Sequence, residues 1–221
     1  MMSEHEEGLR SAAAAGVLVA TGGFLAIVVW LHFVRSDLDP VARGVSRYAA
    51  GPYGLAITLA FGSLSLAVVT AAALLKSATS RRGLVVAAVG LLLVVAFPLR
   101  SASPTHGEYF LHQFGGAVFF VAATIGVFGI AGKLRTVPAP AWLQRTARVS
   151  SAAAGAGLIV FFTSVAARHS LLGPWLGLFQ RICFAAICTA LLTLALGLIR
   201  ESPTDSGPLA SKRRPRPRGA A

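Results

Sequence analysis

The chain has little charge and almost no cysteine. Of its 221 residues only 13% are charged, while 55% are hydrophobic, and no polar stretch is long enough to form a separate soluble domain. So few charges cannot cover a water-exposed surface, which excludes an ordinary soluble globular protein. The two cysteines, Cys183 and Cys188, lie about 140° apart around a helix and cannot pair with each other. We interpret them as small buried hydrophobic residues.

Long apolar runs dominate the sequence instead. A membrane core is about 30 Å thick, and a helix of about 20 apolar residues crosses it. Because backbone in lipid must satisfy its own hydrogen bonds, each run is expected to be a helix. The sequence predicts an all-α, polytopic bundle in residues 11–200, preceded by a short N-terminus, 1–10. Its six transmembrane helices are expected at 11–34, 53–75, 83–99, 112–132, 149–167 and 175–199.

Basic residues predict the orientation of this bundle. One side carries most of them, namely Arg10, Lys76, Arg81, Arg82, Lys133, Arg135, Arg145, Arg148, Arg200, Lys212, Arg213, Arg214, Arg216 and Arg218. The other side has Arg35, Arg43, Arg47, Arg100 and Arg168. Since cytoplasmic loops are enriched in Lys and Arg, both termini are predicted to be cytoplasmic. The expected location is a plasma membrane.

The C-terminal tail, 201–221, is rich in Pro, Ser and Arg and is predicted to be disordered. Its KRRPRPR cluster is suited to binding anionic lipid headgroups, and its positive charge also favours a cytoplasmic position of the tail. Topology also explains the net charge of +12, so nucleic acid is not an expected partner, and membrane lipids are.

Polar residues gather on the predicted outer side. Four of the five histidines, His32, His106, His112 and His169, fall near outer helix ends. Arg181 lies within the last apolar run, where an ionisable residue usually faces a partner or water. Its expected partners are Asp37, Asp39 or Glu108. The resulting hypothesis is an outward-facing cavity that binds a lipid headgroup or a small anion through Arg181, Arg100, His32, His112 and His169.

Other interpretations stay open. These polar residues can be purely structural, because histidines and arginines at helix ends often contact carbonyls or phosphates. A metal-assisted hydrolase of lipid-like substrates would use zinc held by His106, His112 and His169 with Asp37 or Asp39. Haem between His32 and His112 is a further alternative, and otherwise no cofactor is predicted. A permease would need an ionisable path, but the inner halves show only hydroxyls such as Ser63, Ser65, Thr70 and Thr124.

Short motifs in the predicted order resemble a known family. After the first apolar run comes VRSDLDPVARGVSRYAAGPYG, residues 34–54, with Asp39-Pro40 as a helix start. Phe97-Pro98 ends the third run, and His106-Gly107 followed by His112 opens the fourth. Gly177-Leu178-Phe179-Gln180-Arg181 lies in the sixth. These motifs resemble the bacterial membrane proteins of domain-of-unknown-function family 998, which implies a six-helix membrane bundle without an assigned activity.

The chain also departs from that family's pattern. Relatives often have an acidic residue after Phe-Pro, where this chain has Arg100, and a glutamate where it has Gln180. They also space the histidines of the fourth helix more closely. A carboxylate-assisted site would therefore be incomplete here, and a net positive outer site favours an anionic ligand.

Overall fold

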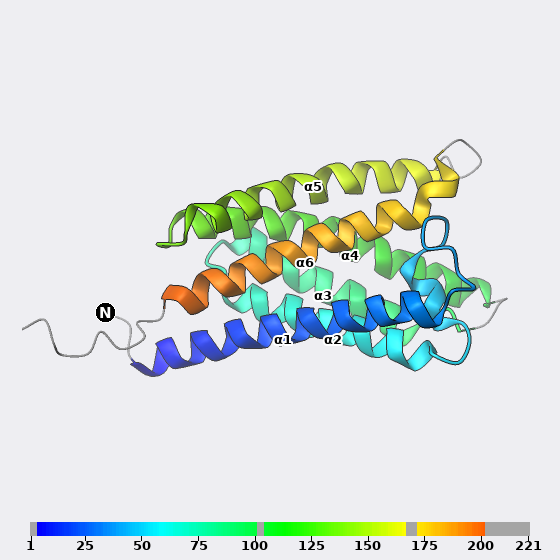
Figure 1. The fold of residues 1–221 in the computed structure, drawn as a ribbon, viewed down its shortest axis with the longest axis horizontal. Helices are drawn as coiled ribbons and strands as arrows, with labels where there is room; N and C mark the ends of the chain where they lie inside the picture. The colour runs from blue at the N-terminus through cyan, green and yellow to red at the C-terminus, as the bar shows by residue number, and fades with distance from the viewer. Residues whose placement is uncertain (1–3, 101–103, 167–171, 202–221) are drawn as a thin grey trace, which may run out of the picture.

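The computed structural model describes residues 4–100, 104–166 and 172–201, and all regular structure in these ranges is helical. Six long helices and two short 3-10 helices follow one another along the chain (Figure 1). Their bounds are α1 Glu4–Val34, η1 Val45–Ala49, α2 Gly54–Ala73, α3 Ala78–Ala96, α4 His106–Arg135, α5 Ala141–Ala166, η2 Gly173–Trp175 and α6 Leu176–Glu201.

All six long helices are long and apolar enough to cross a membrane, which confirms the predicted all-α fold with six spans. Four of them, α1, α3, α4 and α5, begin before the apolar runs on which the prediction rested. In α4, the Thr105 hydroxyl accepts from the Glu108 N–H and the Glu108 carboxylate accepts from the Thr105 N–H, a capping box that starts the helix at His106. In α5, the Pro140 carbonyl accepts the first helical hydrogen bonds, from Leu143 and Gln144.

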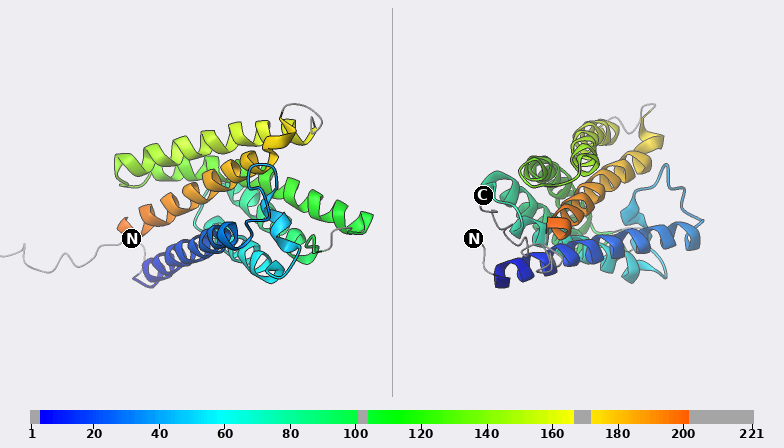
Figure 2. Two further views of the ribbon diagram at one scale, coloured as in Figure 1. Left: turned by 45° about the vertical axis from the view of Figure 1, so that its right-hand side comes forward. Right: turned by 60° about the vertical axis from the view of Figure 1, so that its left-hand side comes forward.

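The helices pack on their neighbours in chain order, and α6 closes the bundle against α1 while also touching α4 and α2. The described chain ends lie at one end of the bundle, here called the proximal end, and residues 35–53 lie at the opposite, distal end (Figures 1 and 2). The connections at 74–77 and 136–140 are also proximal. Which side of the membrane each end faces stays a prediction.

The closest helix contact joins α3 to α4 through glycine. A Cβ atom on Gly90 would lie 2.7 Å from the Gly115 carbonyl oxygen, and one on Gly115 would lie 2.8 Å from the Gly90 carbonyl oxygen. Small residues let two membrane helices approach until their backbones touch. This contact fixes α3 and α4 as a rigid pair on one side of the bundle.

By contrast, α4 and α5 diverge from their proximal connection toward the distal end (Figures 1 and 2). Phenylalanines fill the bundle below this wedge, and Phe184 of α6 lies at their centre. Its ring centroid is 5.3 Å from that of Phe24, 5.5 Å from Phe119 and 4.9 Å from Phe120. The aromatic cluster therefore connects α1, α4 and α6 beneath the widening gap.

The connection between α1 and α2 does not continue as one helix after the helix start predicted at Asp39-Pro40. A turn that bonds the Arg43 N–H to the Asp39 carbonyl is followed by the separate helix η1. The carbonyls of Pro40 and Arg43 accept hydrogen bonds from the Arg181 side chain at 2.6 and 2.7 Å. Because a continuous helix would need these carbonyls for its own hydrogen bonds, the connection folds as two short turns.

Candidate ligand-binding cavity

Arg181, the residue singled out within the sixth apolar run, binds the distal connection to α6. Besides the two loop carbonyls, its guanidinium donates to the Gly177 carbonyl at 3.1 Å and to the Tyr48 hydroxyl at 3.1 Å. Its Nε–H donates to His32 Nε2 at 2.8 Å. One side chain thus links α1, the connecting loop, η1 and α6. We call residues 40–48 together with Arg181 the loop clasp.

The backbone of α6 completes the loop clasp. The Leu178 N–H, at the open N-terminus of the helix, donates to the Val41 carbonyl at 2.9 Å. The Gln180 side-chain oxygen accepts from the Val45 N–H at 2.7 Å. Gly177 allows this approach, since a Cβ atom there would lie 2.7 Å from the Pro40 carbonyl oxygen and closer still to that of Arg43. The small residue at position 177 therefore serves the packing of the loop on α6.

The acidic partner expected for Arg181 was wrong, because each candidate acid has another role. Asp37 accepts two hydrogen bonds from Arg35, at 2.8 Å each. That contact holds the pKa of Asp37 below its ordinary value and raises the pKa of Arg35. Asp39 accepts from the Val41 N–H, and Glu108 caps α4. Main-chain carbonyls and neutral side chains take the place of a counter-ion at Arg181.

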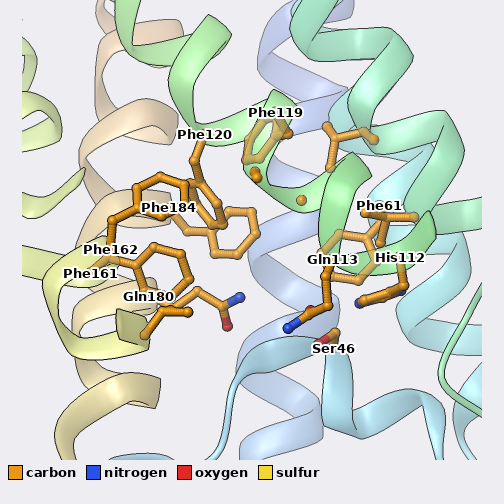
Figure 3. Close-up of a pocket in the computed structure, with 15 residues that line it drawn as sticks. Ser46, Phe61, His112, Gln113, Phe119, Phe120, Phe161, Phe162, Gln180 and Phe184 are labelled. Atoms are coloured by element: carbon orange, nitrogen blue, oxygen red, sulfur yellow. The ribbon is translucent and has the colours of Figure 1, made fainter. Parts of the chain in front are cut away.

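A cavity of about 240 Å³ lies in the wedge between α4, α5 and α6 (Figure 3). Its floor and walls are aromatic and aliphatic, formed by Phe61, Leu91, Val94, Phe119, Phe120, Phe161, Phe162, Val165 and Phe184. Gly116 and Ala117 on α4 leave the space that larger residues would fill. Gln113 and Val165 are exposed, so the cavity reaches the bundle surface between α4 and α5.

Polar residues occur only at the distal end of this cavity. They are Ser46 from η1, His112 and Gln113 from α4, and Gln180 from α6. No Asp, Glu, Lys or Arg is among the fifteen described residues that line it. The loop clasp places Ser46 over the cavity, because Gln180 holds the N–H of the preceding residue, Val45. The site is therefore an apolar pocket with a neutral polar rim.

His112 is the most buried polar residue of this rim, with 4% of its surface exposed. Its Nδ1 lies 2.9 Å from the carbonyl oxygen of Phe97, the residue that ends α3 before Pro98. A residue before proline disfavours helical backbone, so the Phe97 carbonyl is available to a side chain. Phe97 and His112 therefore connect α3 to α4 at the cavity wall.

The structure separates the other predicted site residues. Arg100 lies with Glu108 in a shallow recess at the ends of α3 and α4, apart from Arg181. His106 is exposed at the start of α4. It is six residues from His112, or about 240° around the helix, so the two histidines face different directions. His169 lies outside the described residues.

The zinc site predicted from sequence includes His169, which lies outside the described residues, whereas both histidines of the haem alternative, His32 and His112, are described. Among the residues that the structure describes, no three His, Cys, Asp or Glu side chains are grouped to hold a metal ion. Both ring nitrogens of His32 are within hydrogen-bond distance of protein atoms, Nε2 of Arg181 and Nδ1 of the Val28 carbonyl at 2.6 Å. The zinc and haem alternatives stay predictions, which metal analysis of the purified protein can test.

Sequence reasoning missed most of the residues that form the cavity. Ser46 and Gln180 were noted only within family motifs, while Gln113 and the phenylalanines gave no distinctive signal. A buried phenylalanine has the same sequence signature as one that faces lipid. The convergence of the motifs at one end is visible only in the structure, where Ser46, Phe97, His112 and Gln180 meet around the cavity.

The helices and their apolar surfaces define a multi-pass helical membrane protein with a distal cavity. The sequence model of a family described as "Protein of unknown function (DUF998)" matches residues 18–197, and the chain belongs to this family. The resemblance inferred from the short motifs is thereby confirmed. Comparison with curated proteins and with solved structures gives no match.

Proposed function

We propose that the protein binds a membrane lipid or another amphipathic molecule in the distal cavity. The observation that carries this proposal is the distribution of the lining, with phenylalanines below and neutral polar groups at one end. An acyl chain gains free energy from contact with such walls, and a few convergent polar groups fix the orientation of a ligand. The opening between α4 and α5 offers a path from the lipid phase.

The size of the cavity indicates which part of the ligand enters. Its volume of about 240 Å³ lies just below the range of about 300 to 1,000 Å³ that is typical of small-molecule pockets. It suits one chain and the adjoining polar group, with the rest of the molecule lying between α4 and α5. The distal end would face the outside if the basic residues set the orientation as predicted.

The predicted binding of a headgroup or small anion has one supporting observation. Arg43, Arg47 and Arg100 lie at the distal end, and no side-chain hydrogen bond of theirs is described within residues 4–100, 104–166 and 172–201. They are suited to a phosphate group at the distal surface, outside the uncharged cavity. Arg181 contributes indirectly, because it holds the loop clasp in place.

Lipid mass analysis of the detergent-purified full chain tests the proposal. Ala117→Trp adds an indole to the cavity wall and should abolish co-purification of the bound amphiphile. Val121→Trp is the matched control, since Val121 lies one turn later on α4 and is 44% exposed. This control variant should retain the ligand.

The result also separates the other functional classes. Equal amounts of the same lipid in wild type and both variants would contradict binding in the cavity. Stoichiometric zinc or iron that is lost in His112→Ala would favour the metal-assisted hydrolase or the haem protein.

A further inference from the structure

The hydrogen bond between His112 and Phe97 fixes which nitrogen of the imidazole carries the proton. A carbonyl oxygen can only accept, so Nδ1 must be the donor across the 2.9 Å contact. In the neutral ring, Nε2 then carries a lone pair and acts as an acceptor. The described residues provide no hydrogen bond to this Nε2. Figure 3 shows the ring at the cavity wall beside Gln113 and Phe61.

Gln180 supplies the complementary group on the opposite wall. Its side-chain oxygen accepts from the Val45 N–H, which leaves its NH2 group as a donor. In Figure 3 this amide points into the cavity from the α6 side. An acceptor on α4 and a donor on α6 therefore face the same space.

The surroundings oppose a charged group at this position. The cavity lining contains phenylalanines and no Asp, Glu, Lys or Arg among the described residues. Burying an ion in such surroundings is unfavourable unless an opposite charge accompanies it. A charge on the His112 ring would itself be buried, and no carboxylate among the described lining residues would compensate it.

We propose that the cavity selects a neutral amphiphile with a hydroxyl group, such as a long-chain alcohol or an acylglycerol. The hydroxyl donates to His112 Nε2 and accepts from the Gln180 amide, while the hydrocarbon chain packs on the phenylalanines. A hydroxyl matches this pair because it both donates and accepts. This inference rests on the proposed lipid-binding function and names its ligand class.

Competition binding on the delipidated full chain in detergent tests the ligand class. Radiolabelled hexadecanol is displaced by unlabelled hexadecanol, by its methyl ether, which lacks the donor, and by hexadecanoate at alkaline pH. The alcohol should bind about tenfold more tightly than the ether, because the ether oxygen can accept from Gln180 but offers no donor to His112 Nε2. The ionised hexadecanoate should bind more weakly than the alcohol.

Two variants test whether the preference for the alcohol over the ether comes from the His112 ring. His112→Phe keeps an aromatic ring but lacks the acceptor, so the alcohol and the ether should bind within about twofold of each other. His106→Phe is the matched control on the same helix and should retain the tenfold preference.

Each outcome bears on one claim only. Equal affinities of alcohol and ether in the wild type would overturn the hydroxyl inference while leaving cavity binding intact, and this comparison requires no variant to fold. Tighter binding of hexadecanoate would overturn it in favour of an anionic ligand. If hexadecanol shows no saturable binding, or if Ala117→Trp leaves its binding unchanged, the proposed function itself fails.

Discussion

His32 and His112 lie at the same end of the bundle, and each donates its Nδ1–H to a main-chain carbonyl. Their second nitrogens differ, because that of His32 accepts from Arg181 whereas that of His112 faces a cavity. Residue type and helix position therefore do not distinguish a structural histidine from a binding one. The pairing of the second nitrogen does, so His32 is expected to govern stability and His112 ligand choice.

The largest effect on stability is expected for Arg181→Met, because this change removes all the hydrogen bonds that the Arg181 side chain donates within the loop clasp and to His32. The carbonyls of Pro40 and Arg43 lose their charged donor, so the free energy of unfolding should fall by at least about 3 kcal/mol. Thermal unfolding can be followed with a thiol-reactive dye, because Cys183 and Cys188 are buried and react only on opening. Arg43→Met should leave the transition unchanged, and a stable Arg181→Met would refute the loop clasp.

Gly177→Val tests the loop clasp from its backbone side. The new side chain would collide with the carbonyls of Pro40 and Arg43, which should lower stability by about 1 to 3 kcal/mol. The same dye assay measures it. Gly132→Val, where nothing lies within 4 Å of the added Cβ, separates this collision from the loss of helix propensity. Equal destabilisation of both variants would argue against close packing at Gly177.

His32→Phe and His112→Phe test whether the two histidines have different roles. His32→Phe leaves the Arg181 Nε–H and the Val28 carbonyl without their partner, so it should destabilise by about 1 to 3 kcal/mol. His112→Phe loses one described hydrogen bond and should destabilise by about 1 kcal/mol. Thermal unfolding without added ligand gives both values. The reverse order of stability would contradict the assigned roles.

The smallest effect is expected from Asp37→Asn. The hydrogen bond from Arg35 lowers the pKa of Asp37, so its stabilising contribution is present above the ordinary carboxyl pKa and is lost as pH falls through the lowered value. Asp37 is 61% exposed, so solvent screens the pair and the change should be slight. Unfolding curves at neutral and acidic pH should differ more for wild type than for Asp37→Asn. A large loss of stability of Asp37→Asn at neutral pH would contradict this expectation, because it would mean that solvent does not screen the Arg35–Asp37 pair.

The architecture was readable from the sequence because hydrophobic length has a direct physical meaning in a membrane. The runs of apolar residues predict the six helices, and Arg181 is conspicuous as an ionisable residue among them. Its partners were not readable, because a carbonyl such as that of Pro40 has no side-chain signature. The loop had to fold back onto α6 before these carbonyls could be recognised as partners.

The cavity was hidden for a different reason. Phe161 and Phe184 resemble any other apolar residues of a membrane helix, and only the divergence of α4 from α5 turns them into a lining. Gln113 and Gln180 are separated by a whole helix in the sequence. The family motifs nevertheless indicated the right end of the molecule, because Ser46, His112 and Gln180 belong to them.

Binding in the cavity can be tested by photoaffinity labelling with hexadecanol that carries a diazirine in its chain, followed by peptide mapping of the full-length protein. If the ligand occupies the cavity, labelling is expected at Phe161, Phe162 and Phe184, is saturable by unlabelled hexadecanol and is lost in Ala117→Trp. Labelling confined to lipid-facing positions such as Val121 and Ile159, and unchanged in Ala117→Trp, would contradict a ligand-binding cavity.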